Sequence, residues 1–152
     1  MTARQIGIAW GWYTLSPGFS SLWPPAIPPK PYGSSNLDKI ALVITDGEFN
    51  TPYCKSIIAA KASATGTGER IDCNGTNGTA FDQARNMCTA MQNAGITVYT
   101  VGFGLSKGSQ ASTVMEHCAS GAANAFSAAN GAELRDAFRS IATAISLLRL
   151  SK

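Results

Sequence analysis

Unbroken apolar runs mark the strands that this sequence predicts. Residues 40–45, Ile-Ala-Leu-Val-Ile-Thr, are apolar or β-branched without polar alternation, and the turn dipeptide Asp46-Gly47 follows them. Such a run is typical of a strand buried on both faces, as in a parallel sheet covered by helices. Residues 96–101 repeat the pattern, and residues 124–127 form a shorter third run. We therefore expect three buried strands, the first of which ends at Asp46.

Segments with the periodicity of an amphipathic helix alternate with these runs. We expect helices at residues 3–16, 79–94, 109–119 and 131–148. In the first helix the spacing predicts that the apolar stripe is formed by Ile6, Ala9, Trp10 and Tyr13. Alternation of strands and helices is typical of an α/β fold, with a Rossmann-like parallel sheet of three strands, right-handed crossovers and flanking helices.

Two stretches interrupt the alternation. Residues 17–38 contain most of the prolines and several Ser and Gly residues, and they predict an irregular loop whose apolar side chains rest on the body of the domain. Residues 47–78 form a long insertion rich in Gly, Thr, Asn and Ser, with a short helix near 54–62 as one option. The length of 152 residues predicts one domain that includes both stretches.

Composition narrows the class of protein. Hydrophobic residues make up 45% of the chain and charged residues only 14%, where about 25% is usual in soluble domains. The net charge is +3 without any basic run, so nucleic acid is not an expected partner. The chain contains no apolar stretch of about 18 residues, so we expect no membrane span within it.

The four cysteines, Cys54, Cys73, Cys88 and Cys118, are far apart and form no Cys-x-x-Cys pair. Their even number and the low charge favour two disulfides in an oxidising compartment, with four buried thiols as the alternative. The count alone leaves three pairings open. Since Cys88 and Cys118 lie on the helices that flank the strand at 96–101, and Cys54 and Cys73 share one insertion, we expect the pairs Cys88–Cys118 and Cys54–Cys73.

One family has a similar set of motifs. The segment from Ala41 to Thr51, ALVITDGEFNT, resembles the third metal-site loop of a von Willebrand factor A domain, and the segment from Ala94 to Phe103, AGITVYTVGF, resembles a later helix-to-strand step of that fold. More narrowly, the chain resembles the C-terminal part of TadG-like pilus-assembly proteins, through IGIAWGWYTLSP at 6–17, TDGEFNTPYC at 45–54, CAS at 118–120 and the ending ISLLRLSK.

This resemblance implies a partial von Willebrand factor A domain at residues 1–152 and a bacterial envelope protein of a tight-adherence, or Flp, pilus system. It places the protein in the periplasm or at the cell surface. The complete fold can bind Mg²⁺ through an Asp-x-Ser-x-Ser loop, a Thr and an Asp (a metal-ion-dependent adhesion site). Here Thr2 and Asp46 correspond to the last two ligands, and no Asp-x-Ser-x-Ser loop is present. The chain is therefore expected to be an N-terminally truncated form whose strand at 40–45 lies at an edge of the sheet.

Three functions follow from these observations. The first is a non-enzymatic envelope module for pilus assembly or adhesion that binds protein partners. The second is a metal-dependent adhesion domain whose ion site, including Thr2 and Asp46, is completed by missing sequence or a partner chain. The third, a small α/β enzyme, has the least support. The lone histidine, His117, lies about 100° around its helix from Cys118, so the two do not face each other as base and nucleophile.

Overall fold

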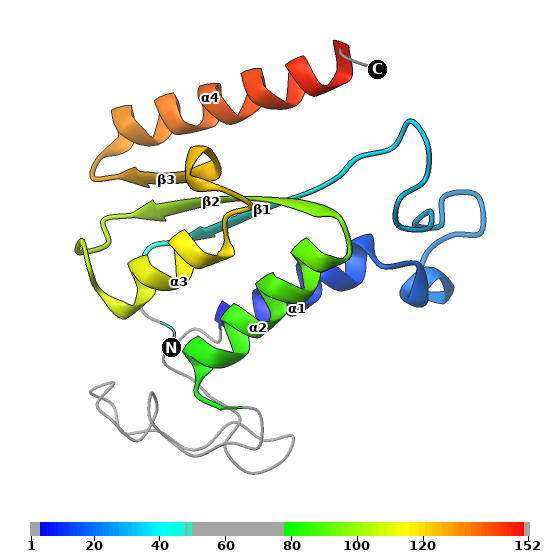
Figure 1. Ribbon diagram of the computed structural model, residues 1–152, viewed down its shortest axis with the longest axis horizontal. Coiled ribbons are helices and arrows are strands. Elements are labelled where there is room, and N and C mark those ends of the chain that lie inside the picture. The colour runs from blue at the N-terminus through cyan, green and yellow to red at the C-terminus, as the bar shows by residue number, and fades with distance from the viewer. Residues whose placement is uncertain (1–3, 48, 50–77, 151–152) are drawn as a thin grey trace.

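The computed structural model describes residues 4–47, 49 and 78–150. Within these ranges the chain forms an α/β domain with three layers (Figure 1). The strands are β1 (Lys39–Thr45), β2 (Ile96–Phe103) and β3 (Ala125–Ala128), and they form one parallel sheet in the order β1-β2-β3. The predicted mixed α/β architecture with a three-stranded parallel sheet is confirmed, and β1 is an edge strand of the described sheet, as expected.

The helices also lie where the periodicity predicts them, with ends that differ by one or two residues. They are α1 (Arg4–Leu15), α2 (Ala80–Asn93), α3 (Gln110–Cys118) and α4 (Gly131–Leu150). Short 3₁₀ turns occur at Pro17–Leu22 and Ala122–Asn124. No helix in the described part of the chain is long and apolar enough to cross a membrane. The possible helix near 54–62 lies outside the described residues.

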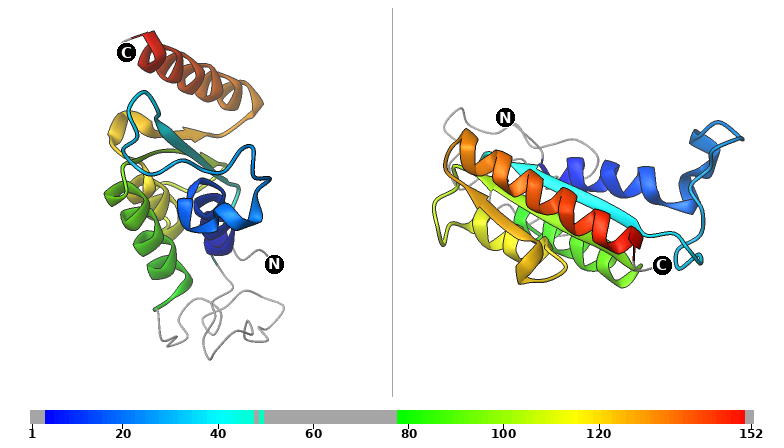
Figure 2. Two further views of the ribbon diagram at one scale, coloured as in Figure 1. Left: turned by 90° about the vertical axis from the view of Figure 1, so that its right-hand side faces the viewer. Right: turned by 90° about the horizontal axis from the view of Figure 1, so that it is seen from above.

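The two faces of the sheet carry cores of different size. Helices α1, α2 and α3 cover one face, and α4 alone covers the other (Figures 1 and 2). The larger core joins β1 and β2 to the first three helices through side chains such as Ile8, Phe81, Met91, Val98 and Val114. The smaller core packs Tyr99 and Val101 of β2 against Ala137 and Ile141 of α4. Because α4 lies over β2 and β3, β1 has little cover on that side.

Helix α1 turns a different side to the core than its apolar spacing predicts. Gln5 and Ile8 are its buried residues, with Trp12 and Leu15 packed against the larger core, whereas Trp10 of the predicted stripe is exposed. The prediction failed because α1 is apolar around most of its circumference, so periodicity alone does not select one face. In the observed orientation Gly7 and Gly11 are exposed.

Candidate functional site

A groove runs along the outer edge of β1, with a volume of about 750 Å³. Helix α1 forms one side of this groove, β1 forms its back, and Leu134 of α4 and Phe103 of β2 border it on the other face of the sheet. We call it the β1 groove. Its lining residues are Arg4, Gly7, Ile8, Gly11, Thr14, Leu15, Phe49, Met91, Phe103, Leu134 and every residue from Ile40 to Asp46.

The α1 side of the groove is recessed because two glycines line it. Gly7 and Gly11 are one helical turn apart, and a Cβ atom added at either would meet no atom within 4 Å. Glycine lowers helix stability by about 1 kcal/mol relative to alanine, so two such residues in one short helix are costly. The space that they leave open lies directly beside β1.

The other side of the groove exposes large aliphatic side chains. Leu42 is 41% and Ile44 is 48% exposed, although the unbroken apolar run predicts burial on both faces of this strand. That prediction is wrong for β1 and right for β2, whose residues from Val98 to Gly102 are all buried. The physical reason is the placement of α4, which Figure 2 (right) shows beside β1 rather than over it.

An ion pair closes the carboxyl end of the groove. The guanidinium of Arg4 donates a 2.6 Å hydrogen bond from Nη2 to Oδ1 of Asp46. The Arg4 side chain is 18% exposed and that of Asp46 is 75% exposed. The hydrogen bond from Arg4 is the main cause that lowers the pKa of Asp46 below its ordinary value, and a backbone hydrogen bond adds to it. Asp46 is therefore ionised and partly neutralised at neutral pH.

One of the two predicted metal ligands lies in the described part of the chain. Asp46 lies at the carboxyl end of β1 as expected, while Thr2 lies outside the described residues. The contact of Arg4 with Asp46 places the first residue of α1 at that same end of the sheet. A guanidinium already neutralises this carboxylate, and no cluster of three His, Cys, Asp or Glu side chains occurs in the ranges described. Among the described residues, Asp46 is thus the one predicted ligand that is placed, and the complete ion site stays a prediction.

One of the two predicted disulfides is confirmed. Cys88 of α2 and Cys118 of α3 form a disulfide with a Cα–Cα distance of 4.9 Å, and both side chains are buried. Gln92 reinforces this connection, because its Nε2 donates to the carbonyl oxygens of Cys118 at 2.9 Å and Ala119 at 3.1 Å. The predicted pair Cys54–Cys73 lies outside the described residues. The disulfide and Gln92 together fasten α2 to α3 beneath β2.

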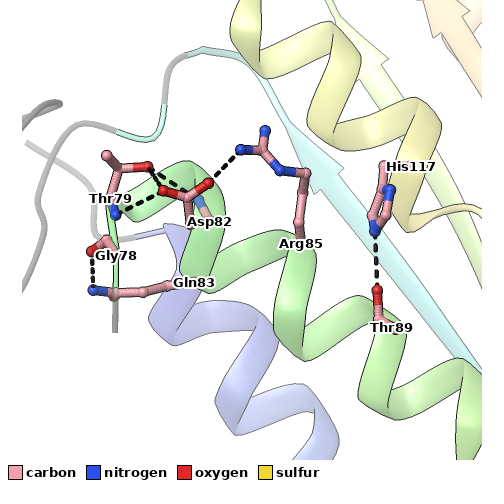
Figure 3. Close-up of polar contacts among 7 residues, drawn as sticks. All are labelled: Gly78, Thr79, Asp82, Gln83, Arg85, Thr89 and His117. Atoms are coloured by element: carbon pink, nitrogen blue, oxygen red, sulfur yellow. Dashed lines mark hydrogen bonds and ion pairs between the residues drawn. The ribbon is translucent and has the colours of Figure 1, made fainter. Parts of the chain in front are cut away.

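Figure 3 shows polar contacts at the start of α2 and between α2 and α3. Thr79 and Asp82 form a reciprocal capping box at the start of the helix. The hydrogen bonds from Thr79 are the main cause that lowers the pKa of Asp82. His117 of α3 places Nε2 at 3.0 Å from Oγ1 of Thr89. In the described part of the chain this ring contact is to a hydroxyl and not to a carboxylate that would orient His117 as a general base.

Sequence reasoning missed the residues that shape the groove. Arg4, Gly7, Gly11 and Leu134 belong to two helices far from β1 in sequence, and only the fold brings them to its edge. The spacing of Gly7 and Gly11, four residues apart in a predicted helix, was the one available signal. It could have indicated a recessed side, but not what faces that side.

Comparison with protein-family models, with curated proteins and with solved structures finds no match for this chain. The resemblance to von Willebrand factor A domains and to TadG-like proteins therefore stays a prediction, and the α/β fold with its parallel sheet stands on the structure.

Proposed function

We propose that this chain is a non-enzymatic interaction module of the bacterial envelope that binds a protein partner through the β1 groove. The observation that carries the proposal is the apolar edge of β1, where Leu42 and Ile44 are exposed in a groove of about 750 Å³. Exposed apolar surface of this kind marks interaction sites in soluble proteins. An exposed apolar edge strand without a partner is also prone to aggregation.

Two further observations support an envelope setting. A disulfide such as Cys88–Cys118 persists in oxidising compartments, including the periplasm and the cell surface. The resemblance to TadG-like pilus-assembly proteins predicts the same location and suggests assembly or adhesion of a Flp-type pilus as the process. In this proposal the domain is the partial von Willebrand factor A domain that the sequence predicts.

The metal-dependent alternative receives less support. It requires Asp46 to bind Mg²⁺ together with Thr2 and ligands from missing sequence or a partner chain. Arg4 now binds the Asp46 carboxylate, so an incoming cation has to displace the guanidinium. A small α/β enzyme remains the weakest of the three candidates, since it needs an acid–base set that neither the sequence nor the described contacts of His117 supply.

Photo-crosslinking in the cells that produce the protein tests the proposal. A photoreactive amino acid at position 42, in the groove, should form an adduct of defined mass with one protein. The matched control carries it at position 139, where the Arg139 side chain is 80% exposed on α4. Equal labelling at both positions, or none at position 42, would contradict a partner in the groove.

Magnesium titration of the chain bound to the partner captured at position 42 separates the alternatives, because the metal-dependent site takes some of its ligands from outside this chain. We expect no Mg²⁺-dependent rise in melting temperature for this complex or for the complex with Asp46→Ala. Saturable Mg²⁺ binding that Asp46→Ala abolishes would support the metal-dependent domain instead.

A further inference from the structure

We infer that the β1 groove accepts an uncharged aliphatic segment of the partner as an additional β-strand beside β1. This inference rests on the proposed function and specifies what the partner presents. It would fail, with the proposed function intact, if the partner bound the same groove through a helix or a loop.

The backbone of β1 provides the first argument. β1 pairs in parallel with β2 from Lys39 to Thr45, and within the described sheet it has no neighbour on its other side. Alternate N–H and C=O groups of a strand point away from its single partner, toward the open edge. The β1 groove lies along this edge for the length of the strand. An extended segment supplies the complementary donors and acceptors, as in β-strand addition.

The usual protection of an edge strand is missing here. Natural edge strands carry charged residues, proline or a bulge that prevent pairing with another chain. Residues 40–45 contain no charge and no proline, and their register with β2 is continuous. The charged residue at the start of the strand, Lys39, turns away: its Nζ donates to the carbonyl oxygen of Leu15 at 2.5 Å and lies 5.0 Å from the centre of the Tyr32 ring.

The two sides of the groove determine which side chains of the added strand would fit. Successive residues of a strand point to opposite faces. One set would contact Leu42, Ile44 and Leu134 on the α4 side, and this apolar surface fits aliphatic residues. The other set would point at Gly7 and Gly11 of α1, where the missing Cβ atoms leave room for it.

The charge of the groove indicates an uncharged occupant. Between Arg4–Asp46 at one end and Leu15 at the other, the lining side chains are neutral, and the two charges at the carboxyl end already pair with each other. A charged residue of the partner would lose its hydration there without gaining an opposite charge. A neutral segment of about seven residues, the length of β1, meets no such penalty.

A second copy of the chain is a less suitable occupant. In a twofold pair of β1 strands, each strand would enter the other copy's groove together with the α1 helix packed beside it. Both α1 helices would then compete for the space along the edge. A single extended segment fills the groove without this conflict.

Synthetic peptides test the inference on the intact chain. The probe is a fluorescent peptide with seven alternating Val and Ala residues between Gly-Ser spacers and lysines for solubility. A second peptide has prolines at alternate positions of the central segment, which removes backbone donors while keeping it apolar. A third has one central Asp. Fluorescence anisotropy should show saturable binding of the probe, at least tenfold weaker binding of the Asp peptide, and no saturable binding of the proline peptide.

Variants of the protein then locate the binding site. Gly11→Leu places a side chain in the groove from α1 and should weaken binding of the probe at least tenfold. Ala142→Leu adds the same side chain at an exposed position of α4 outside the groove and should leave binding unchanged. Both variants first need the far-ultraviolet circular dichroism and melting curve of a folded domain. If Gly11→Leu does not fold, Gly7→Leu replaces it at the same groove.

Several results would overturn the inference. Equal binding of the probe and the proline peptide would show that backbone pairing is not involved. Unchanged binding to Gly11→Leu would place the peptide elsewhere. A dimer in sedimentation analysis that Gly11→Leu dissociates would show that a second copy occupies the groove. If crosslinking at position 42 captures a partner but the probe does not bind, the strand inference fails and the proposed function stands.

Discussion

Strands β1 and β2 are neighbours of similar composition that meet very different surroundings. Ile44 of β1 and Val101 of β2 are register partners on the same face of the sheet, yet Val101 is fully buried while Ile44 is 48% exposed. Helix α4 covers Val101 and the other outward residues of β2, and it leaves Leu42 and Ile44 without cover. Equal hydrophobicity thus stabilises the fold in one strand and leaves apolar side chains exposed in the other, where we propose that a partner binds.

The largest expected difference is in the free energy of unfolding, when a charge is introduced at Val101 or at its register partner Ile44. Val101→Asp buries an unpaired carboxylate between β2 and α4, and it should cost roughly 4 kcal/mol or more of the free energy of unfolding. Ile44→Asp exposes its carboxylate to water in the groove and should cost no more than about 1 kcal/mol. Urea denaturation measures both. Similar losses for the two variants would show that β1 is covered as well as β2.

Removal of the disulfide tests the support beneath β2. Cys88 and Cys118 are 30 residues apart, so their bond should contribute about 3–4 kcal/mol in the chain-entropy model. The double variant Cys88→Ala with Cys118→Ala should lower the free energy of unfolding by that amount. Binding of the aliphatic peptide at 10 °C, where the variant remains folded, should be unchanged because α1 and β1 form most of the groove and α2 contributes Met91 to its lining. A loss of binding by the folded variant would link the groove to the α2–α3 side.

The cap of α2 should have a smaller effect. Thr79 accepts a 3.1 Å hydrogen bond from the backbone N–H of Asp82, and its own N–H donates to the Asp82 carboxylate at 3.0 Å. Thr79→Ala should lower the free energy of unfolding by about 1 kcal/mol. Thr79→Ser keeps the hydroxyl and should retain most of the stability, so equal losses in both variants would argue against capping.

The smallest expected effect concerns the Arg4–Asp46 ion pair, whose removal should change the pKa of Asp46. The hydrogen bond from Arg4 lowers the pKa of Asp46, so the pair stabilises the fold above the unfolded value of about 3.9. This contribution is lost as the pH falls through the lowered folded value. Arg4→Met should raise the pKa of Asp46 toward its ordinary value, measured from the carboxyl carbon by NMR. An unchanged titration would mean that Arg4 does not contact Asp46 in solution.

Some parts of this structure were predicted from the sequence more accurately than others. Apolar runs and helical periodicity predicted the three strands and four α-helices found among the described residues, because burial on a regular backbone leaves a local pattern. The Cys88–Cys118 pair followed from the positions of both residues on helices beside β2. Burial of Leu42 and Ile44 was predicted wrongly, since the cover over a strand depends on where a distant helix, here α4, packs.

The candidate site was predictable only in part. Asp46 was identified by its place after an apolar run, but its partner Arg4 lies 42 residues away and carries no local signal. The side of α1 that meets the core could not be predicted because this helix is apolar nearly all round. For that reason Gly7 and Gly11 were recognised as part of a groove only in the folded chain.

Amide hydrogen exchange of β1 and β2 tests the central claim most directly. We expect slow exchange throughout β2 from Val98 to Val101, since both of its edges are paired or covered over this stretch. In β1 we expect a period of two, with slow exchange at amides bonded to β2 and fast exchange at the alternate amides that face the groove. Saturation with the aliphatic peptide should slow the fast set alone. Uniform protection of residues 40–45 in the chain without peptide would contradict the claim that the edge of β1 is open to a partner.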